Sequence, residues 1–438
     1  MKKVLSIVIS LVLLLSTCTI GAQALSFDCD VQTYSDSILM VNLDSDMVVF
    51  EKDADAKRYP ASLTKIMTFI VVAEFFDDYE NTRIDIKNST IANLEGNGIV
   101  VNSLDRHVGK SLTVLDLMYA MMVPVGHDAA TVFADYIKLN SDKTIVELMN
   151  AKAQKLGLKN THFSNPTGVH SPDHYTTARD LYIMTKYAMG LPHFSKICST
   201  STYYLEGDEY PLVTSNYMID NGRGGDYYYT YATGVKNGTT DEAGRCLVST
   251  GMYDGYAYMI VCLHAPYNYE EDITEQYAMI ESANLYRWAF LNLSFVTQAT
   301  KSTPICEQKI ENSWDTKSIL LVPEKDLNII LPDDYADADI TIVPDSNAPV
   351  SAPIEKGQVI TTATVYYKGD KVTSINLVSQ DEVKVSFIIY ASELVKTILT
   401  SIWFLLAVLI VIVLFVIYVS VSTSYNKKKK ARSKRKYK

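Results

Sequence analysis

One stretch decides how the rest of the chain is interpreted, Pro60-Ala61-Ser62-Leu63-Thr64-Lys65-Ile66-Met67-Thr68. A serine and a lysine three residues apart lie on one face of a helix. The residues that follow, to Phe76, are apolar on most sides, so the helix is predicted to be buried and to shield its first turn. Burial lowers the pKa of a lysine, and a neutral Lys65 amine can accept the proton of the Ser62 hydroxyl.

Ser62 is also predicted near the start of this helix, where backbone N–H groups favour developing negative charge. A Ser-x-x-Lys pattern alone also fits an ordinary serine and lysine on a helix. The remainder of the chain has to decide between these two interpretations.

The composition indicates a globular protein whose charge is unevenly distributed. The chain has 438 residues, 48% of them hydrophobic and 21% charged, enough for two or three domains. Its last thirteen residues carry nine Lys or Arg and no acidic residue. Without these residues and Lys2-Lys3, the chain holds 29 basic and 50 acidic residues, which argues against a nucleic-acid-binding body.

Residues 1–24 are predicted to be a secretory signal peptide. Lys2-Lys3 forms a positive start, an apolar run follows from Val4 to Leu15, and Ala22-Gln23-Ala24 gives a small-x-small cleavage pattern. The alternative is an uncleaved membrane anchor at the same position.

Residues 398–421 carry no charge and are long enough to cross the roughly 30 Å hydrocarbon layer as a helix. The basic tail of residues 426–438 is predicted to be cytoplasmic by the positive-inside rule. The sequence therefore predicts a single-pass membrane protein whose body lies outside the cell. A buried core helix is the alternative for this segment.

Neither the cysteines nor the histidines indicate a metal or another cofactor. Five cysteines remain after residue 24, so at least one is free, and Cys246 and Cys262 are predicted to be buried packing residues. No CxxC or CxxH spacing is present. His170 and His174 have helical spacing, but the serine and proline between them favour a loop.

The middle of the chain alternates strand-like and helix-like segments. A hairpin is predicted over residues 36–50, helices begin at Thr113 and His127, and a helix starts at residues 176–180. Strands are predicted at 231–236, 246–252 and 256–263, followed by a helix at 273–290. This order predicts an α+β fold, a helical subdomain beside an antiparallel sheet that carries helices.

From Phe295 to Val385 short apolar runs alternate with turns, one of them at Lys368-Gly369-Asp370-Lys371. This pattern predicts a small all-β domain. The predicted organisation is a signal peptide at 1–24, a main domain at 30–292, a β-rich domain at 295–388, a span at 398–421 and a tail at 426–438.

Several blocks resemble the low-molecular-weight penicillin-binding proteins, which are serine-type D-alanyl-D-alanine carboxypeptidases. In chain order they are Ser62-Leu63-Thr64-Lys65-Ile66-Met67-Thr68, Val123-Pro124-x-Gly126-x-Asp128-Ala129-Ala130, Thr161-His162-Phe163-x-Asn165-Pro166-Thr167-Gly168, Thr239-Thr240-Asp241-Glu242-Ala243-Gly244 and Trp288-Ala289-Phe290. The resemblance covers residues 35–290. It implies the β-lactamase/transpeptidase-like fold for the main domain, followed by a small all-β domain and a C-terminal membrane helix.

The resemblance also implies an activity. Ser62 would attack the carbonyl between the two terminal D-alanines of a peptidoglycan stem peptide, and Lys65 would take its proton. The oxyanion would lie between the N–H groups of Ser62 and Thr239, and Lys236 would attract the terminal carboxylate. Substrate-binding positions are Lys236, Asn237, Gly238, Thr239 and His127, no cofactor is needed, and β-lactams would acylate Ser62.

Two motifs depart from the family pattern. Val125-Gly126-His127 stands where the family has Ser-x-Asn, and Lys236-Asn237-Gly238 where it has Lys-Thr-Gly. Val125 cannot form a hydrogen bond through its side chain, whereas His127 could replace the Asn and Asn237 keeps a polar group. Arg245 and Arg179 are candidates for a second contact to the carboxylate.

These departures leave two hypotheses open. The first is a slow but real carboxypeptidase. The second is a penicillin-binding or wall-binding sensor or scaffold without turnover. A β-lactamase is disfavoured by the membrane anchor and the β domain, and because no glutamate is evident for fast deacylation.

Overall fold

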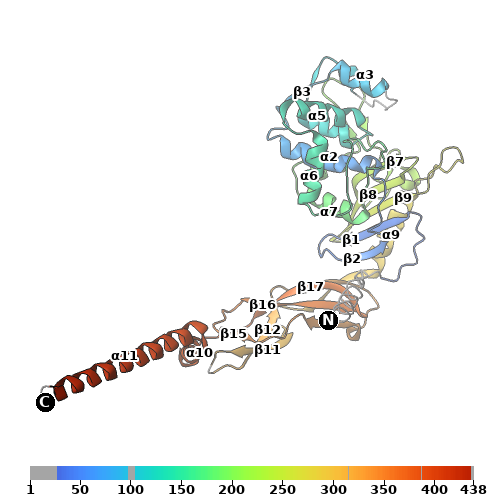
Figure 1. The fold of residues 1–438 in the computed structure, drawn as a ribbon. Coiled ribbons are helices and arrows are strands. Elements are labelled where there is room, and N and C mark those ends of the chain that lie inside the picture. Colours follow the sequence, from blue (N-terminus) through green and yellow to red (C-terminus); the bar gives the residue numbers. More distant parts are fainter. Residues whose placement is uncertain (1–26, 97–103, 314, 386, 436–438) are drawn as a thin grey trace, which may run out of the picture. The chain divides into compact units, whose positions relative to one another are not determined.

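The computed structural model describes residues 27–96, 104–313, 315–385 and 387–435 (Figure 1). The chain divides into two compact units. The first comprises the chain up to Thr297 with Asn328–Thr341 and Val365–Thr373, and the second comprises Gln298–Leu327, Ile342–Thr364 and Ser374–Lys438. The signal peptide predicted at residues 1–24 lies outside the described residues.

The first unit contains a five-stranded antiparallel sheet with the strand order β2-β1-β9-β8-β7 (Figure 1). Its strands are β1 (Ser37–Asn42), β2 (Val48–Lys52), β7 (Ala232–Thr240), β8 (Gly244–Tyr253) and β9 (Tyr256–Ala265). The predicted hairpin over residues 36–50 is confirmed as β1 and β2.

Successive side chains of a strand point to opposite faces of the sheet. Apolar residues on either face are therefore covered by helices. Leu39 and Val41 of β1 belong to the core cluster that also contains residues of α7 (Ala178–Met189), which contacts β1 and β9. Helix α9 (Tyr277–Asn292) contacts β8 and β9. Cys262 Sγ of β9 lies 3.5 Å from Ser282 Oγ of this helix. The predicted α+β fold is therefore confirmed.

The helical part is arranged around α2 (Thr64–Phe75), in which every residue from Thr64 to Ala73 is buried. Helix α2 contacts α4 (Val114–Met122), α5 (His127–Asn140), α6 (Ile145–Lys155) and α7. The predicted helix starts are confirmed at both Thr113 and His127. Thr113 Oγ1 accepts a hydrogen bond from the Asp116 N–H at 3.0 Å, which caps α4.

The remaining elements of this part are short. They are η1 (Ala61–Leu63), β3 (Arg83–Asp85), α3 (Asn88–Gly96), η2 (Asp105–His107), β4 (Ser111–Thr113), α8 (Phe194–Cys198), β5 (Thr202–Tyr203), β6 (Leu212–Val213), η3 (Tyr217–Ile219) and η4 (Gly225–Tyr227).

Two elements of the first unit have boundaries that differ clearly from the predicted ones. The helix expected from Ile273 begins at Tyr277, because Ile273 instead pairs with Asn268 through two backbone hydrogen bonds of 2.8 and 3.0 Å. The strand expected to end at Lys236 continues to Thr240, because its pairing with β8 extends to Gly244. The longer strand carries the whole third motif on one regular element.

The later part of the chain is rich in strands, as predicted. Strand β10 (Leu293–Ala299) pairs with β13 (Leu327–Pro332), and a six-stranded sheet has the order β14-β16-β17-β12-β11-β15. Its strands are β11 (Cys306–Glu311), β12 (Ser318–Pro323), β14 (Ile340–Pro344), β15 (Val350–Ser351), β16 (Val359–Tyr367) and β17 (Asp370–Ser379), with the helical turn η5 at Asp337–Asp339. The predicted turn at Lys368-Gly369 is confirmed between β16 and β17.

Two helices end the chain, α10 (Phe387–Thr400) and α11 (Ile402–Arg435). Within α11, Ile402–Asn426 is long and apolar enough to cross a membrane, and its hydrophobic stretch is not buried inside the protein. A core helix would be buried, so this exposure favours the membrane interpretation over the alternative. The apolar helix begins four residues after the predicted start at residue 398, because Ser401 separates α10 from α11.

Candidate active site

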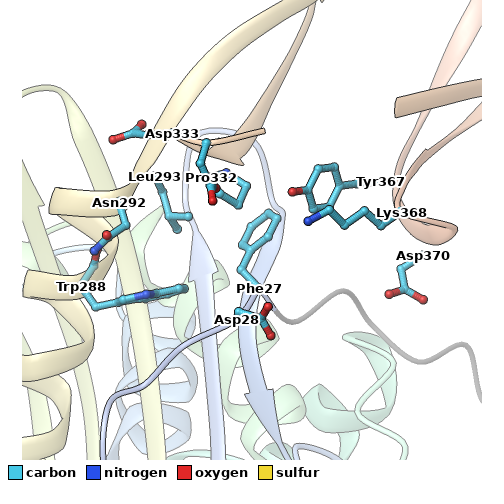
Figure 2. A pocket seen from close by; sticks show the side chains of 11 residues that line it. Phe27, Asp28, Trp288, Asn292, Leu293, Pro332, Asp333, Tyr367, Lys368 and Asp370 are labelled. Carbon is cyan, nitrogen blue, oxygen red and sulfur yellow. The ribbon is translucent and has the colours of Figure 1, made fainter. Parts of the chain in front are cut away.

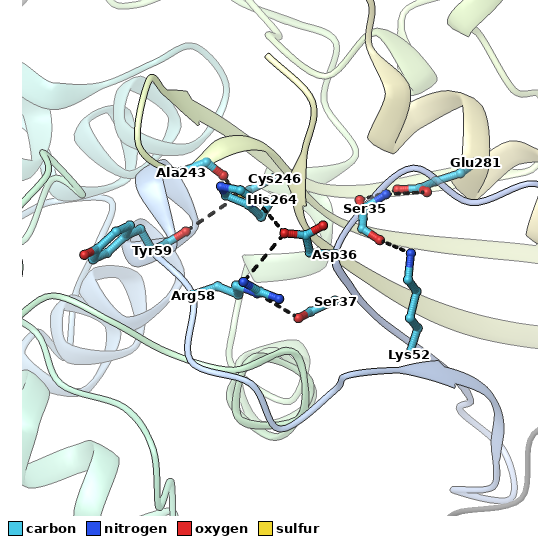
Figure 3. A network of polar contacts seen from close by, with 10 residues as sticks. All are labelled: Ser35, Asp36, Ser37, Lys52, Arg58, Tyr59, Ala243, Cys246, His264 and Glu281. Carbon is cyan, nitrogen blue, oxygen red and sulfur yellow. Dashed lines mark hydrogen bonds and ion pairs between the residues drawn. The ribbon is translucent and has the colours of Figure 1, made fainter. Parts of the chain in front are cut away.

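A polar network holds the backbone that leads into Ser62 (Figure 3). Arg58 donates from Nε to Ser37 Oγ at 3.1 Å, and its Nη1 lies 3.6 Å from Asp36 Oδ2. The same Asp36 oxygen lies 2.7 Å from His264 Nδ1 on β9. Cys246 of β8 contacts the Tyr59 carbonyl with its sulfur at 3.6 Å. These contacts connect the segment before Ser62 to strands β1, β8 and β9 of the sheet.

Ser62 and Lys65 lie side by side at the junction of η1 and α2. Lys65 Nζ is 2.9 Å from Ser62 Oγ and donates a second hydrogen bond to the Thr167 carbonyl at 2.6 Å. The Lys65 side chain is fully buried, and Ser62 is 8% exposed. Ser62 and Lys65 are therefore in hydrogen-bond contact and shielded from water.

Burial lowers the pKa of the three basic side chains in this cluster. Burial lowers the pKa of Lys65 well below its usual value, the nearby charge of Lys236 lowers it further, and Asp128 opposes the shift. Burial lowers the pKa of Lys236 to about 8. His127 has its pKa lowered to about 3, chiefly by burial and then by Lys65 and Lys236, so its imidazole is neutral at physiological pH.

The loop that accepts the second Lys65 hydrogen bond is shaped by Asn165. The Asn165 Oδ1 atom accepts hydrogen bonds from the backbone N–H groups of Thr167 at 3.1 Å and Gly168 at 2.8 Å. Gly168 has φ +85°, and a Cβ atom there would lie 1.9 Å from the Ala61 carbonyl oxygen. Only glycine lets this loop approach η1 closely enough for Thr167 to reach Lys65.

Strand β7 also approaches Ser62, through its contact with η1. A Cβ atom on Gly238 would lie 2.6 Å from the Ser62 backbone nitrogen, so the strand backbone packs directly against it. Thr239, whose N–H is the second predicted oxyanion donor, is the next residue of the strand. The predicted residues Ser62, Gly238 and Thr239 are thus neighbours in space.

Lys236 begins the third motif and is 1% exposed. Its Nζ donates a hydrogen bond to the Pro124 carbonyl at 2.6 Å, which connects the third motif to the second. The structure therefore brings Lys236 and the residues around Pro124 together, although 112 positions separate them in the chain.

The second motif contributes mainly backbone and His127. The Val125 side chain is 38% exposed. Gly126 has φ +59°, and a Cβ atom there would lie 2.4 Å from the Met121 carbonyl oxygen. His127 begins α5, and its Nδ1 lies 3.5 Å from Lys65 Nζ. Of the two side chains that depart from the family motif, only His127 reaches the cluster.

Asn237 is joined to a residue that the sequence did not single out. Ser215 Oγ donates a hydrogen bond to Asn237 Oδ1 at 2.7 Å and lies 3.3 Å from Lys236 Nζ. Ser215 belongs to no family block and follows no periodic pattern. Only the folded chain brings it to the third motif.

The two candidate arginines differ in position. Arg179 is paired with Glu51 at 2.7 Å and with Asp55 at 2.9 Å, so it is occupied elsewhere. Arg245 lies beside Thr239, with Nη1 3.3 Å from Thr239 Oγ1, and its guanidinium stacks 4.6 Å above the Tyr267 ring. Its Nη2 donates a hydrogen bond to the Thr274 carbonyl at 2.6 Å. In the described part of the chain, its buried Nε has no hydrogen-bond partner.

Neither the histidines nor the cysteines of the described residues form a group that could hold a metal ion. His170 and His174 lie in a loop, as predicted, and both ring nitrogens of His174 contact protein atoms, Thr64 Oγ1 at 2.8 Å and the Ser164 N–H at 3.2 Å. Cys246 and Cys262 are buried and free, which confirms their predicted packing role.

A pocket of about 530 Å³ in the first unit lies away from these residues (Figure 2). Phe27, Trp288 and Tyr367 line it together with several aspartates. It contains none of the predicted site residues. Cavity volume alone would not have located the cluster around Ser62.

Comparison with known proteins adds independent information. Residues 23–267 match a family model described as D-alanyl-D-alanine carboxypeptidase, and residues 300–385 match one described as penicillin-binding protein 5, C-terminal domain. The D-alanyl-D-alanine carboxypeptidase DacF of Bacillus subtilis is 26% identical over 390 residues, which cover 85% of this chain and 94% of that protein. A D-alanyl-D-alanine carboxypeptidase of a Streptomyces species is 33% identical over 214 residues, 46% of this chain and 70% of that protein.

The fold also has solved counterparts. A crystal structure of penicillin-binding protein 5 from Haemophilus influenzae matches with a TM-score of 0.65 and 25% sequence identity. The match covers 82% of this chain and 100% of that one. It therefore includes strand-rich segments beyond residue 300 as well as the part that holds Ser62.

Proposed function

The chain belongs to the D-alanyl-D-alanine carboxypeptidase family, and from this premise we propose that it removes the terminal D-alanine of peptidoglycan stem peptides through an acyl-enzyme on Ser62. The observation that carries the proposal is the buried pair of Ser62 and Lys65, with 2.9 Å between hydroxyl and amine. A serine activated by an adjacent base is the usual nucleophile of covalent acyl transfer.

Lys65 acts as the general base. Its lowered pKa favours the neutral amine, which accepts the Ser62 proton as Oγ attacks the carbonyl between the two D-alanines. The proton then passes to the nitrogen of the leaving D-alanine. Water hydrolyses the acyl-enzyme in the second half of the reaction.

The negative oxygen that forms during each attack lies between the N–H groups of Ser62 and Thr239. The close packing of Gly238 against the Ser62 nitrogen supports this assignment, because both donors then lie on adjacent backbones. Donors fixed in this way before the reaction contribute without the cost of reorienting during it.

The terminal carboxylate of the peptide binds to Lys236, Asn237 and Arg245. Lys236 is a buried cation, and Arg245 extends a guanidinium beside Thr239 at the end of the same strand. A planar guanidinium can hold a carboxylate through two parallel hydrogen bonds. Arg245 is therefore our candidate for the second cation of the carboxylate site.

His127 takes the place of the family asparagine beside Lys65. Its neutral imidazole can accept a hydrogen bond from the Lys65 amine through Nδ1, at a separation of 3.5 Å. This contact is longer than a typical hydrogen bond, so His127 orients the amine weakly. We infer a carboxypeptidase that is slower than members with the complete motif.

A second function, a penicillin-binding or wall-binding sensor without turnover, is favoured by the second motif. Val125 exposes an apolar side chain where a hydroxyl would assist the proton transfer. Loss of a general acid–base helper costs about 10²–10⁴ in rate. A protein of this kind would still be acylated by β-lactams but would release little D-alanine.

We also propose that α11 anchors the protein in the bacterial membrane, with the chain before it outside the cell. The support is the length and apolar composition of Ile402–Asn426 and the basic residues that follow it. Under this arrangement, the enzyme acts on wall peptides close to the membrane surface.

The experiment incubates the full-length, detergent-purified protein with a fluorescent penicillin and, separately, with a pentapeptide that ends in D-Ala-D-Ala. Covalent label together with free D-alanine supports the carboxypeptidase, and label without D-alanine supports the sensor. Ser62→Ala must abolish both signals, whereas Ser195→Ala, an exposed serine on α8, serves as the matched control. Absence of label in the unmodified protein contradicts both functions.

A further inference from the structure

The second motif lacks a hydroxyl group, yet the structure holds one at the same cluster. Val125 is apolar and exposed, and just before this motif the Pro124 carbonyl accepts a hydrogen bond from Lys236 Nζ at 2.6 Å. Ser215 lies on the segment between β6 and η3, with its hydroxyl oxygen 3.3 Å from Lys236 Nζ. This serine comes from a different part of the chain but reaches the same lysine.

Backbone contacts fix the position of Ser215. Its N–H donates a hydrogen bond to the Val123 carbonyl at 3.1 Å, one residue before Pro124. The preceding residue, Thr214, is also held. Its carbonyl accepts a hydrogen bond from Arg223 Nη2 at 2.6 Å, and its N–H donates to the Ser201 carbonyl at 2.8 Å. Ser215 is therefore attached directly to the end of α4 that leads into the second motif.

The hydrogen bonds of Ser215 have a definite direction. The Lys236 ammonium can only donate, so the Ser215 oxygen accepts from it and the single hydroxyl proton goes to Asn237 Oδ1 at 2.7 Å. With its oxygen engaged, Asn237 keeps its two N–H donors. Among the described residues these donors have no partner, which suits them to an anion.

We propose that Ser215 is a positioning residue that replaces the missing hydroxyl of the second motif, holding Lys236 and Asn237 in the orientation that receives the substrate carboxylate. This inference rests on the proposed function. It deepens that function by explaining how the altered second and third motifs can operate together. The Ser215 hydroxyl contacts two residues of the third motif, Lys236 and Asn237.

The test compares Ser215→Ala, Ser215→Thr and Ser215→Cys in the full-length protein, with Ser195→Ala as the control. The measurement is the second-order rate of acylation by a fluorescent penicillin, together with D-alanine release from the pentapeptide. Because a hydrogen bond to a charged group contributes about 1.5–3 kcal/mol, Ser215→Ala is expected to slow acylation about 10- to 100-fold. Ser215→Thr retains the hydroxyl and is expected to retain most of the rate. Ser215→Cys keeps the size but not the strong hydrogen bond. It is expected to slow acylation as Ser215→Ala does, and it provides the test if Ser215→Ala does not fold.

Two readouts separate positioning from a structural role. The first is the pH profile, because loss of the hydroxyl favours neutral Lys236 and moves the alkaline decline of the rate to lower pH. The groups that face Lys236 are Lys65 on α2, His127 on α5 and Cys198 on α8, and all three remain in the variants. The second is a double-mutant cycle in which Asn237→Ala costs much less in the Ser215→Ala background than alone.

Failure of the Ser215 inference can be distinguished from failure of the proposed function. If the unmodified protein is neither labelled nor active, the proposed function fails whatever Ser215 does. If the unmodified protein is labelled but Ser215→Ala and Ser215→Cys match Ser195→Ala in rate and pH profile, the Ser215 inference is overturned and the proposed function stands. Additive effects of Ser215→Ala and Asn237→Ala also overturn it.

Discussion

Lys65 lies where water cannot stabilise its charge. Its side chain is fully buried, and Lys236 places a second positive charge nearby, so its pKa falls well below the usual 10.5. The two lysines therefore have different tasks at one pH. Lys65 must lose its proton to act as a base, whereas Lys236, with a pKa of about 8, must keep its proton to attract a carboxylate.

This difference predicts a bell-shaped pH dependence of acylation. The rate rises as Lys65 becomes neutral and declines as Lys236 loses its proton near pH 8. The measurement is the second-order rate of labelling by a fluorescent penicillin between about pH 5 and about pH 10. Lys236→Arg is expected to shift the alkaline decline upward, since a guanidinium keeps its proton. A decline that does not move in this variant would contradict the role given to Lys236.

Replacing the base itself gives a second prediction at this scale. Lys65→Arg keeps a positive charge at every accessible pH, so it cannot accept the Ser62 proton. Acylation is expected to fall by about 10²–10⁴ or more. Lys57→Arg, a change of the same kind outside the cluster, is the matched control and should label at the normal rate.

The altered motifs give a third prediction. The triple substitution Val125→Ser, His127→Asn and Asn237→Thr restores the family residues, and it is expected to raise D-alanine release if these positions limit the natural protein. The measurement is turnover of the pentapeptide by both proteins. Equal turnover by the two proteins would contradict the inference that the altered motifs slow this enzyme.

At the scale of elements, the site is formed where three backbones meet. Helical turn η1 carries Ser62, the loop at Gly168 approaches it from one side, and strand β7 approaches it at Gly238. Such approaches are possible only without Cβ atoms. The glycines therefore set the spacing on which the reaction geometry depends.

Gly238→Ala tests this spacing. The new Cβ atom would lie 2.6 Å from the Ser62 nitrogen, so β7 must shift away from η1. The Thr239 N–H, the second oxyanion donor, would move with the strand. Loss of one such donor costs about 10²–10³ in rate, and acylation should fall by at least that factor. Gly96→Ala has open space around it and is the matched control. Normal labelling by a folded Gly238→Ala protein would contradict the placement of the oxyanion site.

The sequence predicted some elements well because their signals are local. The capping residue Thr113 and the turn at Asp254-Gly255 mark the start of α4 and the hairpin of β8 and β9. The start of α9 was predicted four residues early, because the Asn268 and Ile273 pairing has no local signature. Ser215 was missed for the same reason, since its partners are 21 and 22 positions away along the chain.

At the scale of the whole molecule, the chain combines family membership with a hydrophobic C-terminal helix. Residues 23–267 and 300–385 match two family models in order, and the apolar helix Ile402–Asn426 follows them. The proposed anchor would keep a slow enzyme close to its substrate. High local concentration can then offset a low rate constant, because wall peptides near the membrane meet the enzyme repeatedly.

The anchor and its orientation are testable in cells. The full-length protein is expected to sediment with membranes, whereas a chain that ends before Ile402 should be released. A tag placed after Lys438 should resist protease added to intact protoplasts, while the part that holds Ser62 is digested. A digested tag would contradict the proposed topology, and a truncated chain that still sediments would contradict anchoring by α11.

The most direct test of the central claim is the mass of the peptide that contains Ser62 after incubation with penicillin. We expect this mass to increase by that of one opened penicillin molecule, located on Ser62 by fragmentation and absent from the Ser62→Ala protein. A folded protein whose Ser62 peptide keeps its unmodified mass, or one that carries the penicillin on another residue, would contradict it.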